Sequence, residues 1–261
     1  MAYLVQVKAE SRHANHFSEI AWCVLVLLVL GNGPAAMGAS PPLAAYQMNQ
    51  VASSQEAKKQ LSQYEKALPR AGNNRGPMLA QMARLYFILG DFAGNPSGRE
   101  YYEKGKDWAQ LLEKEQPRRV EGHYWLALNL GGLASLAPAK EALKTLPAII
   151  QELEKAEAID GGYAQGGPHR VLGRIYARAP AWPFSVGDLQ KSEEHLRKAV
   201  KISPDNSTNH LYLAQTLFEM GKTEEARKEL EKTLHSKRHA TGPQGLKEDR
   251  EKARRLLKEY E

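Results

Sequence analysis

The residues best suited to chemistry in this sequence lie between Gly161 and Phe184. Gly166–Pro168 is expected to open a helix, and His169 and Arg170 follow in its first turn, with Arg174 one turn further on. A helix N-terminus offers backbone N–H groups that lack partners within the helix, and its dipole adds a partial positive charge. With these side chains beside it, the turn could hold the carboxylate or phosphate of a ligand or partner.

The same residues also allow a structural interpretation. The glycines would then only form the turn, His169 would pack in the interior, and Arg170 and Arg174 would pair with neighbouring acidic side chains. The two interpretations differ in what satisfies the guanidinium of Arg170, a bound ligand or the protein itself.

Aromatic side chains mark two further candidate surfaces. Trp182 lies in the segment Ala179–Phe184, APAWPF, which two prolines stiffen and which is expected to be a loop between two helices. Tyr124 and Trp125 share another predicted helix with Asn129 and could form an aromatic wall of a binding site. Aromatic residues at helical spacing also commonly belong to the core, so Tyr124 and Trp125 are core residues in the alternative interpretation.

No pattern in the sequence supplies catalytic machinery. It contains no nucleophile elbow, phosphate-binding loop, dinucleotide-binding glycine motif or zinc-protease motif. His235 and His239 have a metal-like spacing but lie in a basic stretch, and His195 and His210 are expected to face a neighbouring helix or solvent. We therefore predict that the chain is not an enzyme and uses no cofactor and no metal.

The segments that must position these residues form an internal repeat. Gly187 and Gly221 are 34 residues apart, and each comes just before a predicted helix. Both helices place a small residue, Ser192 or Ala226, four positions before a leucine. Small side chains let two helices approach to about 8–10 Å, and regularly spaced leucines form the buried stripe. The pattern resembles the tetratricopeptide repeat (TPR), a unit of paired helices.

This resemblance implies an all-α fold, a right-handed α-solenoid of about four TPR-like helix pairs with a terminal capping helix. No segment alternates with the period of a strand, so strand content should be near zero. Pro147 is expected in the first turn of a helix capped by Thr145, where a missing N–H costs little. The predicted helices span 46–68, 76–90, 98–115, 119–136, 146–159, 168–179, 188–202, 206–220, 223–236 and 244–260.

Some stretches go beyond a general TPR pattern. They are YYEKGKDWAQLLE at 101–113, VEGHYWLALNLGGLA at 120–134 and GGYAQGGPHRVLGRIYARAPAWPF at 161–184, together with the spacing that joins them. They resemble the TPR-type periplasmic T component associated with TRAP transporters, which import carboxylates and related solutes. The resemblance covers roughly residues 55–235. A tethered T component would carry a lipidation cysteine, and the single cysteine, Cys23, is not placed for that role.

Composition fits a folded protein that does not bind nucleic acid. Hydrophobic residues make up 42% of the chain and charged residues 25%, enough to build a core and keep the surface polar. The net charge is +6, but acidic and basic residues alternate closely, whereas a nucleic-acid-binding surface would show a basic stripe.

The N-terminal 39 residues have the pattern of a targeting segment. Ile20–Leu30 is apolar and uncharged, too short to span a bilayer of about 30 Å as a helix, and Lys8 and Arg12 precede it. We predict a signal peptide or N-terminal anchor at 1–39, a linker at 40–45 and the TPR-like α-solenoid domain at 46–261. The protein would be periplasmic or secreted, or anchored in the inner membrane by the N-terminal segment.

These patterns predict an exported, non-catalytic TPR binding or adaptor protein. The family resemblance implies a periplasmic solute-binding protein of a TRAP-type carboxylate uptake system as partner, and it leaves room for a small carboxylate or hydrophobic ligand and for a homo-oligomer. The alternative is a general protein–protein interaction scaffold in envelope assembly with no small-molecule ligand. The candidate binding residues are Tyr124, Trp125, Asn129, His169, Arg170, Arg174 and Trp182.

The targeting segment generates a first prediction. If residues 1–39 are a signal peptide, the mature N-terminus should lie between about Ala36 and Ala45, because signal peptidase cleaves after small residues that follow the apolar core. N-terminal sequencing of the protein from its native host measures this. An intact Met1 on protein in the cytosol would contradict export, and full-length protein found only in the membrane would favour an anchor.

Overall fold

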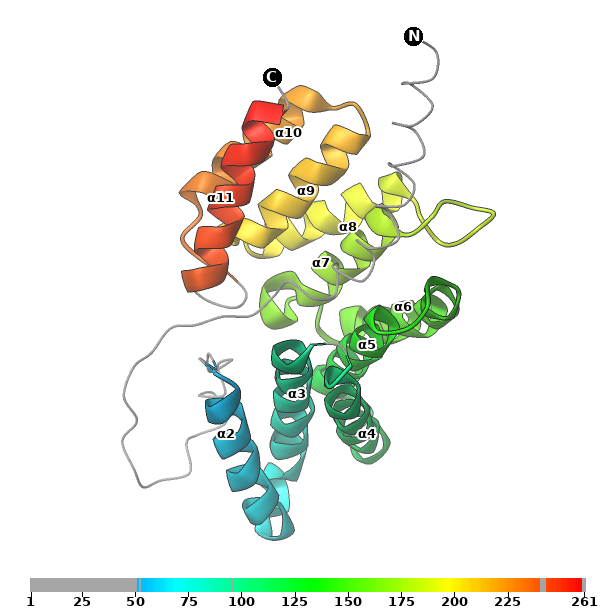
Figure 1. Ribbon diagram of the computed structural model, residues 1–261, viewed down its shortest axis with the longest axis vertical. Coiled ribbons are helices and arrows are strands. Elements are labelled where there is room, and N and C mark those ends of the chain that lie inside the picture. The colour runs from blue at the N-terminus through cyan, green and yellow to red at the C-terminus, as the bar shows by residue number, and fades with distance from the viewer. Residues whose placement is uncertain (1–50, 52, 95, 240–242, 260–261) are drawn as a thin grey trace.

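The computed structural model describes residues 51, 53–94, 96–239 and 243–259, and these residues are almost entirely helical (Figure 1). Short 3-10 turns at Leu68–Arg70 and Gly72–Asn74 join α2 to α3. Apart from two isolated bridges, no β-structure occurs in this part of the chain, which confirms the predicted all-α fold. The helices are α2 Ser54–Ala67, α3 Arg75–Ala93, α4 Gly98–Glu115, α5 Val120–Ser135, α6 Ala139–Asp160, α7 Tyr163–Arg178, α8 Leu189–Ile202, α9 Ser207–Glu219, α10 Thr223–His235 and α11 Pro243–Glu259.

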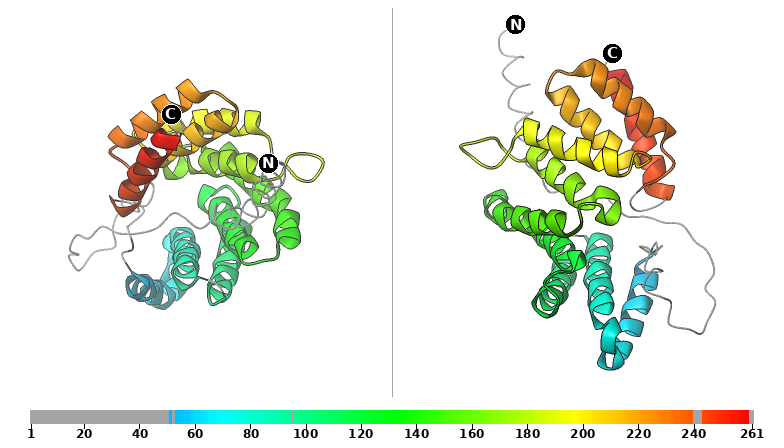
Figure 2. Two further views of the ribbon diagram at one scale, coloured as in Figure 1. Left: turned by 45° about the horizontal axis from the view of Figure 1, so that its top comes forward. Right: turned by 180° about the vertical axis from the view of Figure 1, so that it is seen from behind.

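The helices pack in sequential pairs. Extensive contacts join α3 with α4, α5 with α6, α7 with α8, and α9 with α10, and α4 packs as extensively on α5 of the next pair. At one end α2 packs on α3, and at the other α11 packs on α10 and α9. Figure 2 shows the pairs following one another in a curved array with these two helices at its ends. The predicted plan of four TPR-like pairs with terminal helices is confirmed.

Side chains that bond free backbone N–H groups fix several helix starts. Asp188 caps α8 and Asn206 caps α9, each by accepting two N–H groups of the first turn. Ser53 caps α2, so this helix begins at Ser54, and residues 46–50 of the predicted helix lie outside the described residues. Gly221 turns the chain between α9 and α10 with a φ of 76°, a left-handed conformation that glycine adopts at no steric cost.

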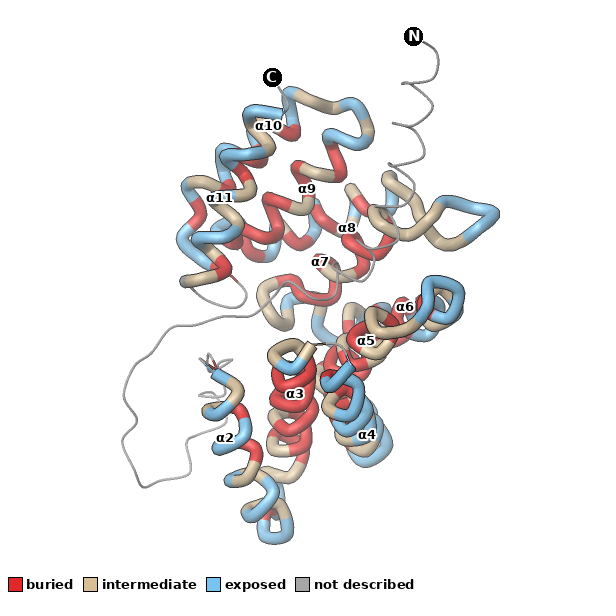
Figure 3. Tube along the Cα trace, viewed as in Figure 1, coloured by how far each residue is buried: buried red, intermediate tan, exposed pale blue. Residues whose placement is uncertain are grey.

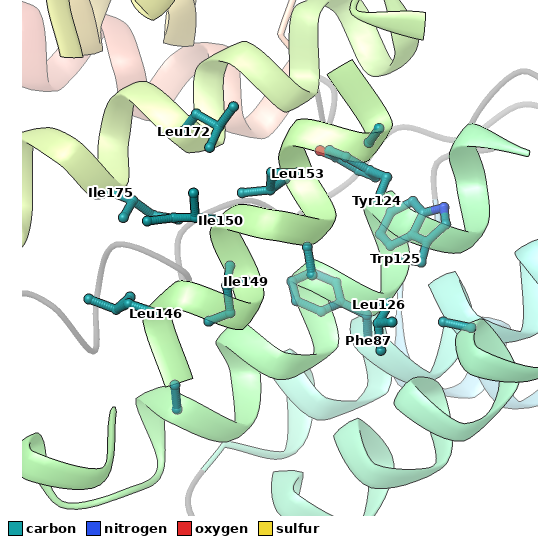
Figure 4. Packing of buried hydrophobic residues seen from close by; sticks show 14 of the residues in the cluster. Phe87, Tyr124, Trp125, Leu126, Leu146, Ile149, Ile150, Leu153, Leu172 and Ile175 are labelled. Carbon is teal, nitrogen blue, oxygen red and sulfur yellow. The ribbon is translucent and has the colours of Figure 1, made fainter. Parts of the chain in front are cut away.

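Buried residues lie where the paired helices face each other (Figure 3). The largest hydrophobic cluster is centred on α5, α6 and α7, and Figure 4 shows Leu126, Leu153 and Leu172 among its members. The two small residues predicted at helix contacts, Ser192 and Ala226, are fully buried. The repeat register deduced from the sequence therefore holds.

The prediction for Pro147 was wrong. This proline lies in the interior of the continuous helix α6, and Thr145 donates a hydrogen bond to the carbonyl of Glu141 in place of capping a helix. A proline inside a helix costs about 3 kcal/mol, because it removes one N–H and crowds the carbonyl four residues earlier. The helix persists because Ala142 and Leu146 before the proline, and Ile150 after it, are buried in one core, while the proline itself faces solvent.

The predicted signal peptide or anchor and the linker lie outside the described residues. No helix in the described part of the chain is both long and apolar enough to cross a membrane.

The register of the last pair generates a second prediction. Ala226→Leu should lower the free energy of unfolding by about 1–3 kcal/mol, because α10 packs at this position against Leu196, Leu213 and Leu217 without spare volume. Urea denaturation followed by circular dichroism measures the change. Lys228→Leu on an exposed face of the same helix is the control and should have little effect. Equal stability of the two variants would show that the contact is not tightly packed.

Candidate functional site

The structure separates the seven predicted binding residues into two groups. Trp182 is 84% exposed on the loop between α7 and α8. The other six are buried within the helix pairs: Tyr124, Trp125, Asn129, His169, Arg170 and Arg174.

Three of the buried residues belong to α5. Tyr124 and Trp125 lie in the largest hydrophobic cluster, where the core interpretation places them (Figure 4). The indole Nε1 of Trp125 donates to the hydroxyl of Tyr163 over 3.1 Å. The amide Nδ2 of Asn129 donates to the backbone carbonyls of Ala83 and Trp125. Together these side chains tie α5 to α3 and to the start of α7.

A left-handed turn leads into α7. Ala164, Gln165 and Gly166 have φ angles of 52°, 62° and 77°. This conformation costs about 1–2 kcal/mol for each residue that has a Cβ atom. The turn is also tightly packed, because a Cβ atom on Gly166 would lie 3.1 Å from the Cα atom of Ala199 in α8. The start of α7, predicted to be an open anion cradle, is therefore covered by protein.

Arg170 supplies the hydrogen bonds that close this turn. Its side chain is 1% exposed, and Nη2 donates to the carbonyl of Ala164 over 3.2 Å. Nη1 donates to the carbonyl of Gln165 and to Oδ1 of Asn209, over 3.3 and 3.1 Å. The partners of Arg170 are neutral oxygens of the protein, whereas the sequence predicted either a ligand anion or acidic side chains.

Arg174 lies one turn further along α7 and joins it to α9. Nη1 donates to Oε1 of Gln215 over 3.1 Å. The guanidinium also lies over the ring of Tyr212, 4.5 Å from its centroid, a favourable cation–π contact. Both arginines thus hold consecutive helix pairs together.

A histidine occupies the same position in the first helix of three consecutive pairs, at His123, His169 and His210. In the outer two pairs, Nδ1 bonds a glutamate of the second helix, Glu152 at 2.8 Å or Glu229 at 2.5 Å. Nε2 bonds the carbonyl of a proline six residues earlier. Burial alone would raise the pKa of Glu229, but hydrogen bonds from His210 and a lysine outweigh it and the pKa is lowered. Each histidine therefore clamps two helices and the turn before them.

The central pair departs from this arrangement. His195 occupies the position on α8 that corresponds to the two glutamates, and its Nδ1 lies 3.3 Å from Nδ1 of His169. A carboxylate comes instead from α6, where Glu157 lies 3.5 Å from His169 and 3.8 Å from His195. Burial lowers the pKa of both histidines, although the charge of Glu157 acts in the opposite direction.

Sequence reasoning missed these clusters because their members come from separate helices. A signal was present in the spacing: His123 and His210 are 87 residues apart, and Glu152 and Glu229 are 77 apart. These two spacings differ by ten residues, which is about the length of the insertion between α5 and α6. Each histidine and its glutamate therefore occupy equivalent positions in the two helix pairs.

The exposed aromatic residues stand on a well-anchored loop. Trp182 and Phe184 are 84% and 82% exposed, on the loop that projects beyond α7 and α8 at the right of Figure 1. The base of the loop is held by the bridge between Ala181 and Gly187 and by the bond from the Asp188 N–H to the carbonyl of Tyr176.

A groove of about 480 Å³ lies beside this loop. Its apolar lining includes Pro147 and Ile150 of α6, Tyr176 of α7 and Trp182. Charged residues of α6 and α8, among them Glu154 and Lys191, also line it. An apolar floor with charged groups beside it suits a protein segment that brings both apolar and polar side chains.

The role of Arg170 generates a third prediction. Arg170→Met should lower the free energy of unfolding by about 2–4 kcal/mol, because the part-buried carbonyl of Ala164 and the buried Oδ1 of Asn209 would lose a donor. Arg197→Met is the matched control: this exposed arginine pairs with Glu193 and Glu225, and its loss should cost less than about 1 kcal/mol. Urea denaturation of both variants gives the comparison. If Arg170→Met is as stable as the control, the guanidinium is not needed for folding and is available for a ligand.

Comparison with known proteins agrees with this architecture. A thermophilic TPR protein from Thermus thermophilus superposes with a TM-score of 0.59 at 21% sequence identity, covering 77% of this chain and 92% of its own, which shows a TPR-like fold. Yeast Tom70 gives a TM-score of 0.35 at 11% identity over 98% of this chain and 72% of its own. No curated protein sequence matches this chain.

A family profile covers the helical part of the chain. The profile described as TRAP transporter T-component matches residues 43–261, which include every helix that the structure describes. The match spans most of the chain, and the four helix pairs lie within it. The chain therefore belongs to the TRAP transporter T-component family.

Proposed function

We propose that this protein is an exported, non-catalytic adaptor of a TRAP-type carboxylate uptake system and that it binds the system's solute-binding protein in the periplasm. Membership of the T-component family and the TPR-like fold support a role in protein interaction. The targeting pattern of residues 1–39 supports the location.

The exposure of Trp182 and Phe184 carries the proposal. Leaving two large aromatic side chains in water forgoes the stabilisation that their burial would give, roughly 1.5–3 kcal/mol for a residue of this kind. Aromatic anchors dominate the energy of many protein interfaces, because they bring a large contact area at a small cost in conformational entropy. The fixed base of the loop lowers that cost further, since the backbone is already ordered before a partner binds.

The groove beside the loop extends the surface that a partner would contact. The side chain of Trp182 forms part of its lining, so the loop and the face of α6 around Ile150 are one continuous surface. In this arrangement the two aromatic residues are the anchors, and Glu154 and Lys191 select the orientation of the partner.

A fourth prediction tests this surface. The Trp182→Ala and Phe184→Ala substitutions should each weaken binding of the solute-binding protein from the same transport system by about 2 kcal/mol, roughly thirtyfold, without lowering the melting temperature. Calorimetric titration against the full chain measures the affinity. Phe218→Ala, which removes a partly exposed aromatic from α9, is the control and should leave binding unchanged.

Two outcomes would contradict the proposal in different ways. Unchanged affinity of the Trp182 and Phe184 variants would place the interface elsewhere on the protein. No binding of the solute-binding protein by the unaltered chain would favour the alternative, a general scaffold in envelope assembly with no small-molecule ligand.

A further inference from the structure

Three helices bring metal-binding side chains together at the centre of the array. Glu157 comes from α6, His169 from α7 and His195 from α8. The two imidazole Nδ1 atoms are 3.3 Å apart. Oε1 of Glu157 lies 3.5 Å from Nδ1 of His169, and Oε2 lies 3.8 Å from Nδ1 of His195. Ligands at about 2.0–2.1 Å from a tetrahedral zinc ion lie roughly 3.3 Å from one another, so these separations are close to those of a zinc site.

The neighbouring pairs show what is unusual in this cluster. In the outer clamps the second helix supplies a glutamate, and a lysine three residues later neutralises it, as Lys155 does for Glu152 and Lys232 for Glu229. In the central pair His195 occupies the position of the glutamate, so the Nδ1 atoms of two imidazoles face each other. Only one of these two nitrogen atoms can donate the hydrogen bond between them. A cation between them would satisfy both nitrogen atoms at once.

The charge state of the cluster also suits a metal. His169 is buried and His195 is half-buried, and neutral imidazole is the form that binds metal ions. Lys198 lies 3.9 Å from Glu157 but 2.9 Å from Glu194, so its closer partner is outside the cluster. By contrast, two glutamates lie beside His123, Glu152 of α6 and Glu113 of α4. Lys155 bonds both of them, at 2.8 and 3.3 Å, and already compensates their charge.

We propose that Glu157, His169 and His195 bind a Zn²⁺ ion. Two imidazoles and one carboxylate are a ligand set that zinc favours, and hard cations such as Mg²⁺ prefer oxygen ligands alone. The side chain of Glu157 is partly exposed, so water can reach the cluster and fill the fourth position. The ring of Tyr176 stacks on His195 and holds its orientation. The bound ion would cross-link α6, α7 and α8 at the junction of two helix pairs.

Zinc titration of the full chain without an affinity tag tests the site. We expect one Zn²⁺ per chain by elemental analysis, a higher melting temperature with zinc that EDTA reverses, and no such change with Mg²⁺. His195→Gln and Glu157→Gln should each weaken zinc binding by at least about a hundredfold, since removing a ligand exceeds the effect of losing a supporting contact. His123→Gln alters the Lys155-compensated cluster and should leave zinc affinity unchanged.

Each variant is compared without metal by circular dichroism, so that misfolding is separated from lost binding. With Co²⁺ in place of zinc, the visible absorption of a tetrahedral site should appear in the unaltered protein and in His123→Gln, and be absent from His195→Gln. The proposal is overturned if the unaltered chain takes up no zinc at micromolar concentrations. It is equally overturned if His195→Gln and Glu157→Gln bind zinc as tightly as the unaltered chain.

Discussion

The buried guanidinium of Arg170 is the contact on which the middle of the protein depends. Two residues with side chains, Ala164 and Gln165, adopt a left-handed conformation that is unfavourable by itself. Their carbonyls point to one cation, which also binds Asn209 of α9. The bond to Asn209 is buried and the two bonds to the turn are part-buried, so the turn, α7 and α9 are fixed together. The direction of every later helix pair follows from that junction.

His123 and His210 make the same contacts in their helix pairs, and His169, at the equivalent position between them, makes different ones. His123 and His210 each connect a glutamate of the partner helix with the preceding turn, so these pairs are closed by local hydrogen bonds. At His169 the glutamate comes from the previous pair, because His195 occupies the usual place. The central cluster therefore links two pairs, as Glu113 of α4 also does at 3.4 Å from His123, whereas Glu229 joins His210 within one pair. The central cluster lies next to the left-handed turn, where the chain passes from the pair α5–α6 to the pair α7–α8.

Much of the fold was predictable because helix periodicity, caps and small residues are local in sequence. Ser192 and Ala226 were placed correctly from their spacing alone. Pro147 was misplaced because burial of α6 on both sides of the proline outweighs the lost hydrogen bond. The environment of Arg170 could not be predicted, since its partner Asn209 is 39 residues away and the left-handed turn has only one glycine. The exposure of Trp182 followed from its proline-rich loop, whereas the cluster around Glu157 required knowledge of how three helices meet.

The position of the aromatic loop has a consequence for divergence within the family. The loop joins α7 to α8, two helices that already pack against each other, and a bridge closes its base. Lengthening such a loop adds little to the entropy of closing it, because its ends are held by other contacts. The segment between the two bridged residues, Ala181 and Gly187, can therefore change in length and sequence without altering the spacing between helix pairs. If this loop recognises the partner as proposed, recognition and architecture are encoded in separable parts of the chain, and one scaffold can be adapted to different partners by substitutions in a few consecutive residues.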